Sequence, residues 1–428
     1  MDSKILIAVI AVIAVVGGAA AFFMLSGDDE VKDSTDFDDQ SGALLIYGNA
    51  NGDSVLDSKD VETIKGLIES DTYLKIADAN MDGVIDSKDV EIVEKLIAHK
   101  ITKAYYLDMT DGPTAFEYPI TSFMGIHQFV LMPMVAIGAM QYMDGYTLSS
   151  SGVEAATMLQ NLYDSEINVN TSYNSVDVEK LASLPTKPEY IITLSSSLAN
   201  ENKLEKSGIQ IIHLDFNGFA GSVSAIRTSG FMLNLADEAQ EYVKFTEDLI
   251  KDIQTKVISK ISDSQRKTVM CGYMTNCIDH LNGSYTPLAV AAGAKAVIEG
   301  SAANGNYVEF NRGDEWILAY NEDYFFYMNS WEYAGDIDEV SQYKKAADYF
   351  TTLKSYKSGH FVVFNSIMPP SLTVAYMAEV LYPDLVGEGY GDKMNQEYIN
   401  KYFPDYAKTF KASDNTFFIT YDMVKDKL

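Results

Sequence analysis

Hydrophobic and polar positions follow different periods in successive parts of the chain. Residues 5–25 are 21 uncharged, mostly apolar residues, enough for one helix to cross a bilayer. A small-residue pair, Ala19 and Ala21, resembles a signal-peptidase site, but apolar residues continue beyond it, which favours an uncleaved signal anchor over 1–27. Residues 28–42 are mainly acidic and aperiodic, which predicts a solvated linker.

Two short apolar stripes with helical spacing follow the linker. They consist of Val61, Ile64, Leu67 and Ile68, and of Val90, Val93, Leu96 and Ile97. Neither stripe can be buried alone, so we expect the two helices to pack on each other in one small all-α module over 43–100.

The remainder, 101–428, alternates strand-like apolar runs with helical segments. The runs at 190–194, 209–215, 268–273, 324–328 and 361–364 predict mostly parallel sheets, and the length suits two α/β lobes. The segment of about 224–261 has one apolar face, with acidic residues early and lysines late. It predicts a single long helix that joins lobes of about 101–222 and 263–428.

Each stripe is preceded by a loop rich in oxygen-bearing side chains, and the two loops repeat with an offset of 29 residues (78 − 49). The oxygens stand at loop positions 1, 3, 5, 9 and 12, with a backbone carbonyl at position 7, which is the ligand order of a calcium loop. The sequence therefore predicts two calcium ions. Their expected ligands are Asn49, Asn51, Asp53, the Val55 carbonyl, Asp57 and Asp60, and then Asp78, Asn80, Asp82, the Val84 carbonyl, Asp86 and Asp89.

The first loop departs from the pattern at two positions. Position 1 is the uncharged Asn49, and position 6, where the chain normally turns sharply on a glycine, is Ser54. We therefore expect the first loop to bind calcium more weakly than the second.

Because each loop is followed by its own helix and no helix precedes the first loop, residues 43–100 resemble a type I dockerin. The resemblance implies a cohesin-bearing partner contacted through loop positions 10 and 11, here Ser58, Lys59, Ser87 and Lys88. A calcium-stabilised spacer without a partner is the alternative.

Composition narrows the possible functions. The net charge is −29, so the basic footprint of a nucleic-acid-binding protein is absent. Cys271 and Cys277 form either a disulfide or a pair of small buried residues. Arginine occurs only at 227, 266 and 312, which disfavours a highly anionic ligand.

The large domain resembles the class III solute-binding proteins of ABC importers. The supporting segments, in order, are 187–192, 207–215, 288–294, 321–324 and 376–384. The resemblance implies an ABC permease as partner and an iron or cobalt chelate (siderophore, haem or cobalamin) as ligand. Its cleft residues, carried over by position, are Phe123, Met124, His127, Ser195, Ser196, Tyr273, Asn276, Trp331, Tyr333, Ser366 and Met368.

Two histidines are interpreted differently. His127 is a candidate axial ligand for haem or cobalt, whereas His213 lies within a predicted strand and is interpreted as structural.

The sequence thus predicts a non-enzymatic solute-binding protein, anchored in the cell membrane with most of its chain outside. An extracellular hydrolase of a cohesin–dockerin assembly is the alternative, although no Gly-x-Ser-x-Gly motif is present. A purely adhesive surface protein is a third interpretation.

Overall fold

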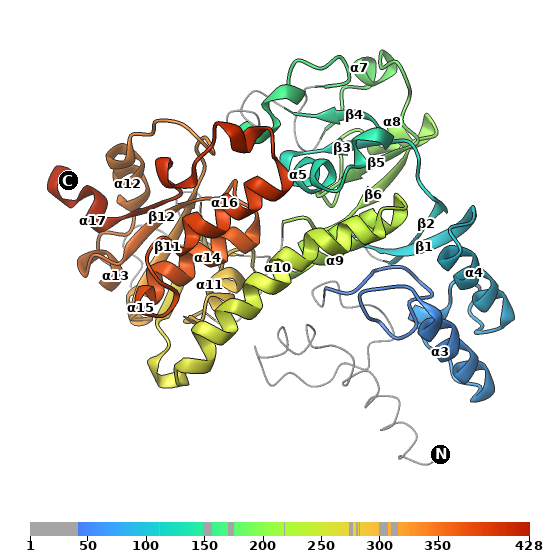
Figure 1. Cartoon of the computed structure of the whole chain (residues 1–428), viewed down its shortest axis with the longest axis horizontal. Coiled ribbons are helices and arrows are strands. Elements are labelled where there is room, and N and C mark those ends of the chain that lie inside the picture. Colours follow the sequence, from blue (N-terminus) through green and yellow to red (C-terminus); the bar gives the residue numbers. More distant parts are fainter. Residues whose placement is uncertain are drawn as a thin grey trace. The chain divides into compact units, whose positions relative to one another are not determined.

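The computed structural model describes residues 42–110, 112–148, 156–169, 175–217, 219–273, 277–279, 281, 283–298, 307–309 and 316–428 (Figure 1). The predicted signal anchor and nearly all of the predicted acidic linker lie outside these residues. Within them, no helix combines the length and the apolar character needed to span a bilayer.

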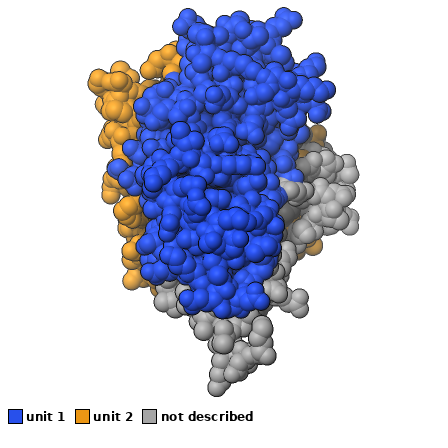
Figure 2. Space-filling view, turned by 90° about the vertical axis from the view of Figure 1, so that its right-hand side faces the viewer, with its two compact units in different colours: residues 1–149, 164–243 blue, residues 150–163, 244–428 orange. Residues whose placement is uncertain are grey.

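The chain divides into two compact units, which Figure 2 shows in different colours. Unit 1 comprises 1–149 and 164–243, and unit 2 comprises 150–163 and 244–428. The predicted calcium module therefore belongs to the same unit as the first lobe. The expected lobe limits of 101–222 and 263–428 differ from this division, because 156–163 belongs with unit 2 and the second boundary falls at 243.

The calcium module contains the two predicted helices. They are α3 (Ser58–Glu69) and α4 (Ser87–Ile97), with a 3-10 turn, η1 (Lys75–Ala77), between them. Each helix starts with an aspartate N-cap and a capping box, which satisfies backbone N–H groups that would otherwise lack partners. The predicted stripes form one shared core that includes Val61, Ile64, Leu67 and Val93, whereas the predicted stripe residue Ile68 is exposed.

A two-stranded antiparallel sheet joins this module to the rest of unit 1. It consists of β1 (Thr102–Asp108) and β2 (Gly112–Tyr118). The segment before the first loop runs along β1, with N–O distances of 2.9 Å from Tyr47 to Tyr105 and 3.0 Å from Leu107 to Leu45. Helix α4 contacts β1 from the module side (Figure 1). The module is thus attached through backbone pairing as well as through the chain.

The main sheet of unit 1 is fully parallel, as the apolar runs predict. Its order is β4 (Met143–Thr147), β3 (Phe123–Ile126), β5 (Tyr190–Thr193) and β6 (Gln210–His213). The short helices of this unit are α5 (Gln128–Ala136), η2 (Ala139–Tyr142), α7 (Val178–Ala182) and α8 (Glu201–Lys206). One buried cluster includes Met124, Ile126 and Ile191 from the strands.

The predicted single helix over 224–261 is wrong, because the chain forms two helices there. They are α9 (Phe219–Met232) and α10 (Ala236–Lys256). Between them Asn234 has a left-handed φ of 57°, and the Leu235 N–H bonds to the Gly230 carbonyl at 2.8 Å. A Cβ on Gly230 would lie 2.2 Å from the Ala239 Cβ. The close approach of α10 to α9 at this point therefore requires a glycine at position 230. Helix α10 begins in unit 1 and ends in unit 2.

Unit 2 contains a mixed sheet with a parallel centre. Its order is β10 (Tyr307–Glu309), β8 (Cys277–Asp279), β7 (Thr268–Tyr273), β11 (Tyr324–Asn329), β12 (Phe361–Asn365) and β13 (Phe418–Thr420), and β9 (Lys295–Ala296) also pairs with β7. The strands β7, β11 and β12 are parallel, whereas β8, β10 and β13 run antiparallel to their neighbours.

Helices and short 3-10 turns complete unit 2. The helices are α11 (Thr286–Ala291), α12 (Glu339–Ala347), α13 (Lys354–Lys357), α14 (Pro370–Leu381), α15 (Pro383–Val386), α16 (Tyr390–Tyr402) and α17 (Tyr421–Val424). The 3-10 turns are η3 (Thr157–Leu162), η4 (Ile258–Lys260), η5 (Asp263–Gln265), η6 (Trp316–Ala319), η7 (Tyr406–Lys408), η8 (Ala412–Asp414) and η9 (Lys425–Lys427). The core between sheet and helices is rich in aromatic rings, among them Phe325, Phe350 and Phe361.

The two cysteines are buried and free. In the β7–β8 ladder Cys271 is opposite Asp279 and Cys277 is opposite Tyr273, so the two thiols are diagonal neighbours rather than a facing pair. Of the two alternatives, the structure therefore contains the pair of small buried residues.

Candidate functional site

The two oxygen-rich loops share one internal hydrogen-bond pattern at the offset of 29 residues. The side-chain oxygen at position 3 accepts from the N–H at position 5, at 2.9 Å for Asn51 and 2.7 Å for Asn80. The carboxylate at position 5 accepts from the N–H at position 7, at 2.9 Å for Asp53 and 3.1 Å for Asp82. These bonds give the side-chain oxygens at positions 3 and 5 the same orientation in both loops.

The carboxylate at position 12 closes each loop. Asp60 accepts from the N–H groups of Asn51 at 3.2 Å and Asp57 at 2.8 Å, and Asp89 makes the equivalent bonds at the same two distances. Both side chains are fully buried. Burial raises the pKa of Asp60 to about 7, and the nearby Asp53 and Asp57 carboxylates add to this rise. Burial raises the pKa of Asp89 as well, and the Asp78 carboxylate contributes.

The loops differ at position 1. The Asp78 carboxylate accepts from the Asp82 N–H at 3.1 Å and the Gly83 N–H at 2.9 Å. The Asn49 amide nitrogen instead donates to the carbonyls of Leu44 and Asp53, both at 2.8 Å. The Asn49 Oδ1 is buried without a hydrogen-bond partner. An orphaned buried oxygen is costly unless something binds it, so the position suits a cation.

The expected strain at Ser54 is absent. The left-handed residue of the first loop is Gly52, with a φ of 68°, while the second loop uses Met81 at 57° and Gly83 at 87°. The first loop therefore turns at position 4, where its sequence has a glycine. The uncharged Asn49 remains as the reason to expect weaker binding there.

Both loops have the donors that calcium takes, namely carboxylate, carboxamide and backbone carbonyl oxygens. The side chains of Val55 and Val84 at position 7 are exposed. In the described residues no three His, Cys, Asp or Glu side chains are gathered as a metal cluster. The fit to a cation thus rests on the repeated loop geometry and on the Asn49 oxygen.

The predicted partner-binding residues are all at the surface. Ser58, Lys59, Ser87 and Lys88 are exposed at the first turns of α3 and α4. The Lys88 Nζ lies 3.1 Å from Asp82 and 3.3 Å from Asp86. These contacts are solvent-exposed and contribute little to stability.

In unit 1, three predicted ligand residues lie where parallel strands end, the usual position of ligand sites in such sheets. His127 follows β3 with a φ of 85°, and its Nδ1 accepts from the Phe129 N–H at 3.3 Å. Burial lowers the pKa of His127 to about 4, so the imidazole is neutral at physiological pH. Ser195 and Ser196 follow β5, where the Ser195 Oγ donates to the Ser197 carbonyl at 2.6 Å.

In unit 2, two predicted residues occupy the equivalent strand ends. Tyr273 ends β7, half-buried, with its ring 5.6 Å from that of Tyr285. Ser366 follows β12, and its Oγ lies 2.9 Å from that of Ser330, an exposed residue just after β11. Sequence reasoning missed Ser330, although its position directly after a predicted strand could have indicated it.

Five other predicted ligand residues lie in the interior. They are Phe123, Met124, Trp331, Tyr333 and Met368. Phe123 and Met124 are at the start of β3 rather than at its end. The Trp331 indole N–H donates to the Thr416 carbonyl at 2.7 Å, and the Tyr333 hydroxyl donates to Asn395 at 2.5 Å. Asn276 lies outside the described residues.

His213 has the structural role that its strand position predicts. Its Nδ1 lies 2.6 Å from the Ser195 carbonyl oxygen, and its Nε2 lies 3.3 Å from Glu201 Oε1. The ring thus fixes the end of β6 to the loop after β5.

The arginines that the structure describes lie away from the carboxyl ends of the strands. Arg227 is buried on α9, where it donates to the Gly42 carbonyl and to Gln240. Arg266 precedes β7 and so lies at the amino end of that strand. Arg312 is outside the described residues.

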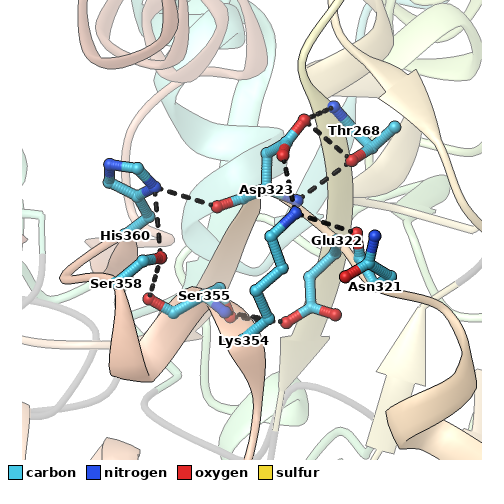
Figure 3. A network of polar contacts seen from close by, with 8 residues as sticks. All are labelled: Thr268, Asn321, Glu322, Asp323, Lys354, Ser355, Ser358 and His360. Atoms are coloured by element: carbon cyan, nitrogen blue, oxygen red, sulfur yellow. Dashed lines mark hydrogen bonds and ion pairs between the residues drawn. The ribbon is translucent and has the colours of Figure 1, made fainter.

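A network of Ser, His and Asp side chains lies at the amino ends of β7, β11 and β12 (Figure 3). Asp323 accepts from the Thr268 N–H and hydroxyl at 3.0 and 2.9 Å, and from Lys354 at 3.0 Å. The His360 Nδ1 lies 3.3 Å from the Ser358 Oγ and 3.2 Å from the Asp323 backbone carbonyl. A carbonyl only accepts, so Nδ1 must carry the proton in that bond and cannot act as a base for the serine. The network joins strand ends and does not form a hydrolase triad.

Unit 2 also contains a hollow of about 750 Å³ that the sequence did not indicate. Tyr327 and Asn329 of β11 line it, opposite Lys344 and Lys345 of α12. Two aspartates also line it, so its charge is mixed and it gives no clear preference for an anion.

Comparisons with known proteins agree with this architecture. A family model described as periplasmic binding protein matches 135–366, more than half of the chain, and leaves 43–100 outside. Similar structures include a periplasmic solute binding protein of Veillonella parvula, with 14% identity, 76% of this chain and 99% of that chain covered, and a TM-score of 0.51. The molybdate-bound periplasmic binding protein MolA of Haemophilus influenzae is 16% identical, with 70% and 98% covered and a TM-score of 0.53. Helicobacter pylori CeuE with Ni(II) bound is 14% identical, with 72% and 99% covered and a TM-score of 0.54. No curated protein matches the chain.

Proposed function

The chain belongs to the periplasmic binding protein family, and from this premise we propose that it carries an iron or cobalt chelate to an ABC permease from a membrane-anchored position outside the cell. Proteins of this family are non-enzymatic, extracytoplasmic transport components that bind small molecules and deliver them to ABC permeases. The identity of the ligand, the anchor and the calcium module are the parts that we propose.

The chemistry of the strand ends carries the ligand proposal. They present the hydroxyls of Ser195, Tyr273, Ser330 and Ser366 and the neutral His127, while the described arginines lie elsewhere. Highly anionic ligands normally need guanidinium groups to neutralise them, because desolvating an unpaired charge is costly. A compact, weakly charged complex such as a hydroxamate siderophore or a corrinoid fits the chemistry of these strand ends better than a tri-anionic catecholate does.

Native mass spectrometry of the full chain, purified without denaturation, tests this proposal. We expect one retained iron- or cobalt-containing molecule per chain. Tyr273→Ala should weaken its retention about tenfold, the value of one lost aromatic contact of about 1.4 kcal/mol. Tyr320→Ala is the matched control, because Tyr320 is exposed before the amino end of β11. Equal retention by both variants would place the ligand away from β7.

We further propose that the two loops bind two calcium ions. Calorimetric titration of the full chain should find two sites, and the second loop should bind more tightly because Asp78 is charged and Asn49 is not. Asp82→Ala should therefore reduce calcium affinity and helical circular dichroism more than Asp53→Ala. Glu94→Ala, which removes an exposed charge from α4, should change neither. Circular dichroism that is the same in calcium and in EDTA would refute this proposal.

We also propose that the calcium module docks to a cohesin through Ser58, Lys59, Ser87 and Lys88. All four are exposed beside the loops, and replacing them together should abolish capture of a cognate cohesin while calcium binding persists. Replacing either pair alone should do less, because the repeat offers the partner two similar surfaces. Lys65→Ala, on the exposed face of α3, is the control. Undiminished capture after the fourfold replacement would refute these four residues as the contact surface, and no capture by the native chain would favour a spacer without a partner.

A further inference from the structure

The segment before the first calcium loop is fixed to α9. The Leu45 N–H donates to the Thr228 Oγ1 at 3.1 Å, inside the protein. Arg227, only 5% exposed, donates to the Gly42 carbonyl and, at 3.0 Å, to Gln240 of α10. An arginine remains charged at all relevant pH values, so burial makes these partners necessary. One side chain thus connects the pre-loop segment with both helices.

The first loop holds the same segment from its other side. The Asn49 amide donates to the Leu44 carbonyl at 2.8 Å, and the Leu44 N–H donates to the Asp53 carbonyl at 3.0 Å. Asn49 also provides the orphaned oxygen at loop position 1. Any movement of Asn49 towards a cation is therefore transmitted to a segment that is already bonded to α9.

The far end of the module reaches the break between α9 and α10. His99, just after α4, has its Nδ1 2.9 Å from the Tyr118 hydroxyl. That hydroxyl donates to Asn234 Oδ1 at 3.2 Å, and Asn234 is the left-handed residue of the break. Three side chains thus link the calcium module, the end of β2 and the joint between the helices.

Further contacts fix this joint, defined here as residues 230–240. The Tyr118 ring stacks on Phe231 with centroids 5.1 Å apart, and the Ile120 N–H donates to the Met232 carbonyl at 2.8 Å. A cavity of about 230 Å³ separates part of the module from α9. It is lined by Leu56 and Ile97 of the module and by Phe231 of α9. Hydrogen bonds rather than continuous packing therefore hold the module to the joint on this side.

We propose that the 43–100 module acts as a clamp on the α9–α10 joint, so that calcium binding in the loops and the order of the joint are coupled. This inference rests on the proposed calcium binding and goes beyond it. Helix α10, whose first residues belong to the joint, continues into unit 2. Coupling of this kind is reciprocal, and typical values change affinity by about 5- to 150-fold.

Hydrogen exchange of the full chain, in calcium and in EGTA, tests the clamp. Calcium should slow exchange within 49–60 and 78–89, and should also slow it at least about fivefold within 230–240. Tyr118→Phe keeps the ring on Phe231 but removes both hydroxyl bonds. In this variant the loops should still respond to calcium, while the response of the joint should be weaker. Tyr343→Phe is the control, because it removes a buried hydroxyl that donates to the Phe361 carbonyl at 3.2 Å, within unit 2.

Each outcome decides a different question. Loops that respond to calcium beside a joint that does not would overturn the clamp and leave calcium binding intact. Tyr118→Phe with an unchanged joint response would also overturn it, as would loss of the response in Tyr343→Phe. If the loops themselves do not respond, calcium binding fails and the clamp fails with it.

Discussion

Gly48 stands at the entrance of the first calcium loop, and replacing it with alanine should destabilise the calcium module strongly. Its φ is 103°, and an added Cβ would lie 2.6 Å from Val93 Cγ2 and 3.2 Å from Ala79 Cβ. Both neighbours are fully buried in the core shared by α3 and α4. The new methyl group therefore has no space unless α4 moves.

Two costs add at this position. The left-handed backbone costs a non-glycine residue about 1–2 kcal/mol. Overpacking a close-packed core costs about 1–3 kcal/mol more. We expect Gly48→Ala to lower the free energy of unfolding of the module by about 2–5 kcal/mol, from the sum of these two terms.

Substitutions at two other glycines allow the backbone cost and the packing cost to be measured separately. Gly83 has a φ of 87° with no atom within 4 Å of its Cβ position, so Gly83→Ala should cost only the backbone term of about 1–2 kcal/mol. Gly66 lies within α3 with open space around it, and Gly66→Ala should stabilise the module by about 1 kcal/mol through helix propensity. Urea titration of the full chain in saturating calcium, read from hydrogen exchange of α4 amides, measures all three. Equal losses for Gly48→Ala and Gly83→Ala would refute the predicted clash with Val93.

Three further predictions concern unit 2. Burial alone would raise the pKa of Asp323, but hydrogen bonds from Thr268 and Lys354 outweigh it and hold that pKa below 3.8. The stability that Asp323 contributes is therefore present above pH 4 and lost as the pH falls further. Acid unfolding of Asp323→Asn should lack this part of the pH dependence. An acid-unfolding profile equal to that of the native chain would contradict the lowered pKa of Asp323. Cys271 and Cys277 should both react with a thiol reagent after unfolding without reductant, whereas no reaction would indicate a disulfide. Gly391→Ala should cost about 1–3 kcal/mol in thermal or urea unfolding, because its Cβ would lie 2.2 Å from the buried Tyr376 ring, and an unchanged midpoint would contradict this packing.

The sequence predicted those elements whose local pattern is strong. The strands at β5, β7, β11 and β12 are continuous apolar runs, and such runs in a chain of this length are buried in parallel sheets. The calcium-loop pattern is recognisable because oxygen-bearing residues recur at fixed spacing, and the structure repeats the hydrogen bonds of loop positions 3, 5 and 12.

The sequence did not predict features that depend on tertiary contacts. Gly230 and Asn234 are tolerated singly inside a helix, and what fixes the break is the close approach of Ala239 and the bond from Tyr118. Trp331 and Tyr333 follow a strand end, where an aromatic side chain can face a ligand or the core. Only the positions of Thr416 and Asn395, which are distant in sequence, show that both face inward.

The ligand proposal can be tested by calorimetric titration of the full chain with a ferric hydroxamate, a ferric catecholate, haem and cobalamin. We predict that one weakly charged complex binds tightly, one molecule per chain. Tight binding of the tri-anionic catecholate alone would contradict the charge argument drawn from the positions of Arg227 and Arg266. No binding to any of the four would contradict the proposal that this protein carries an iron or cobalt chelate.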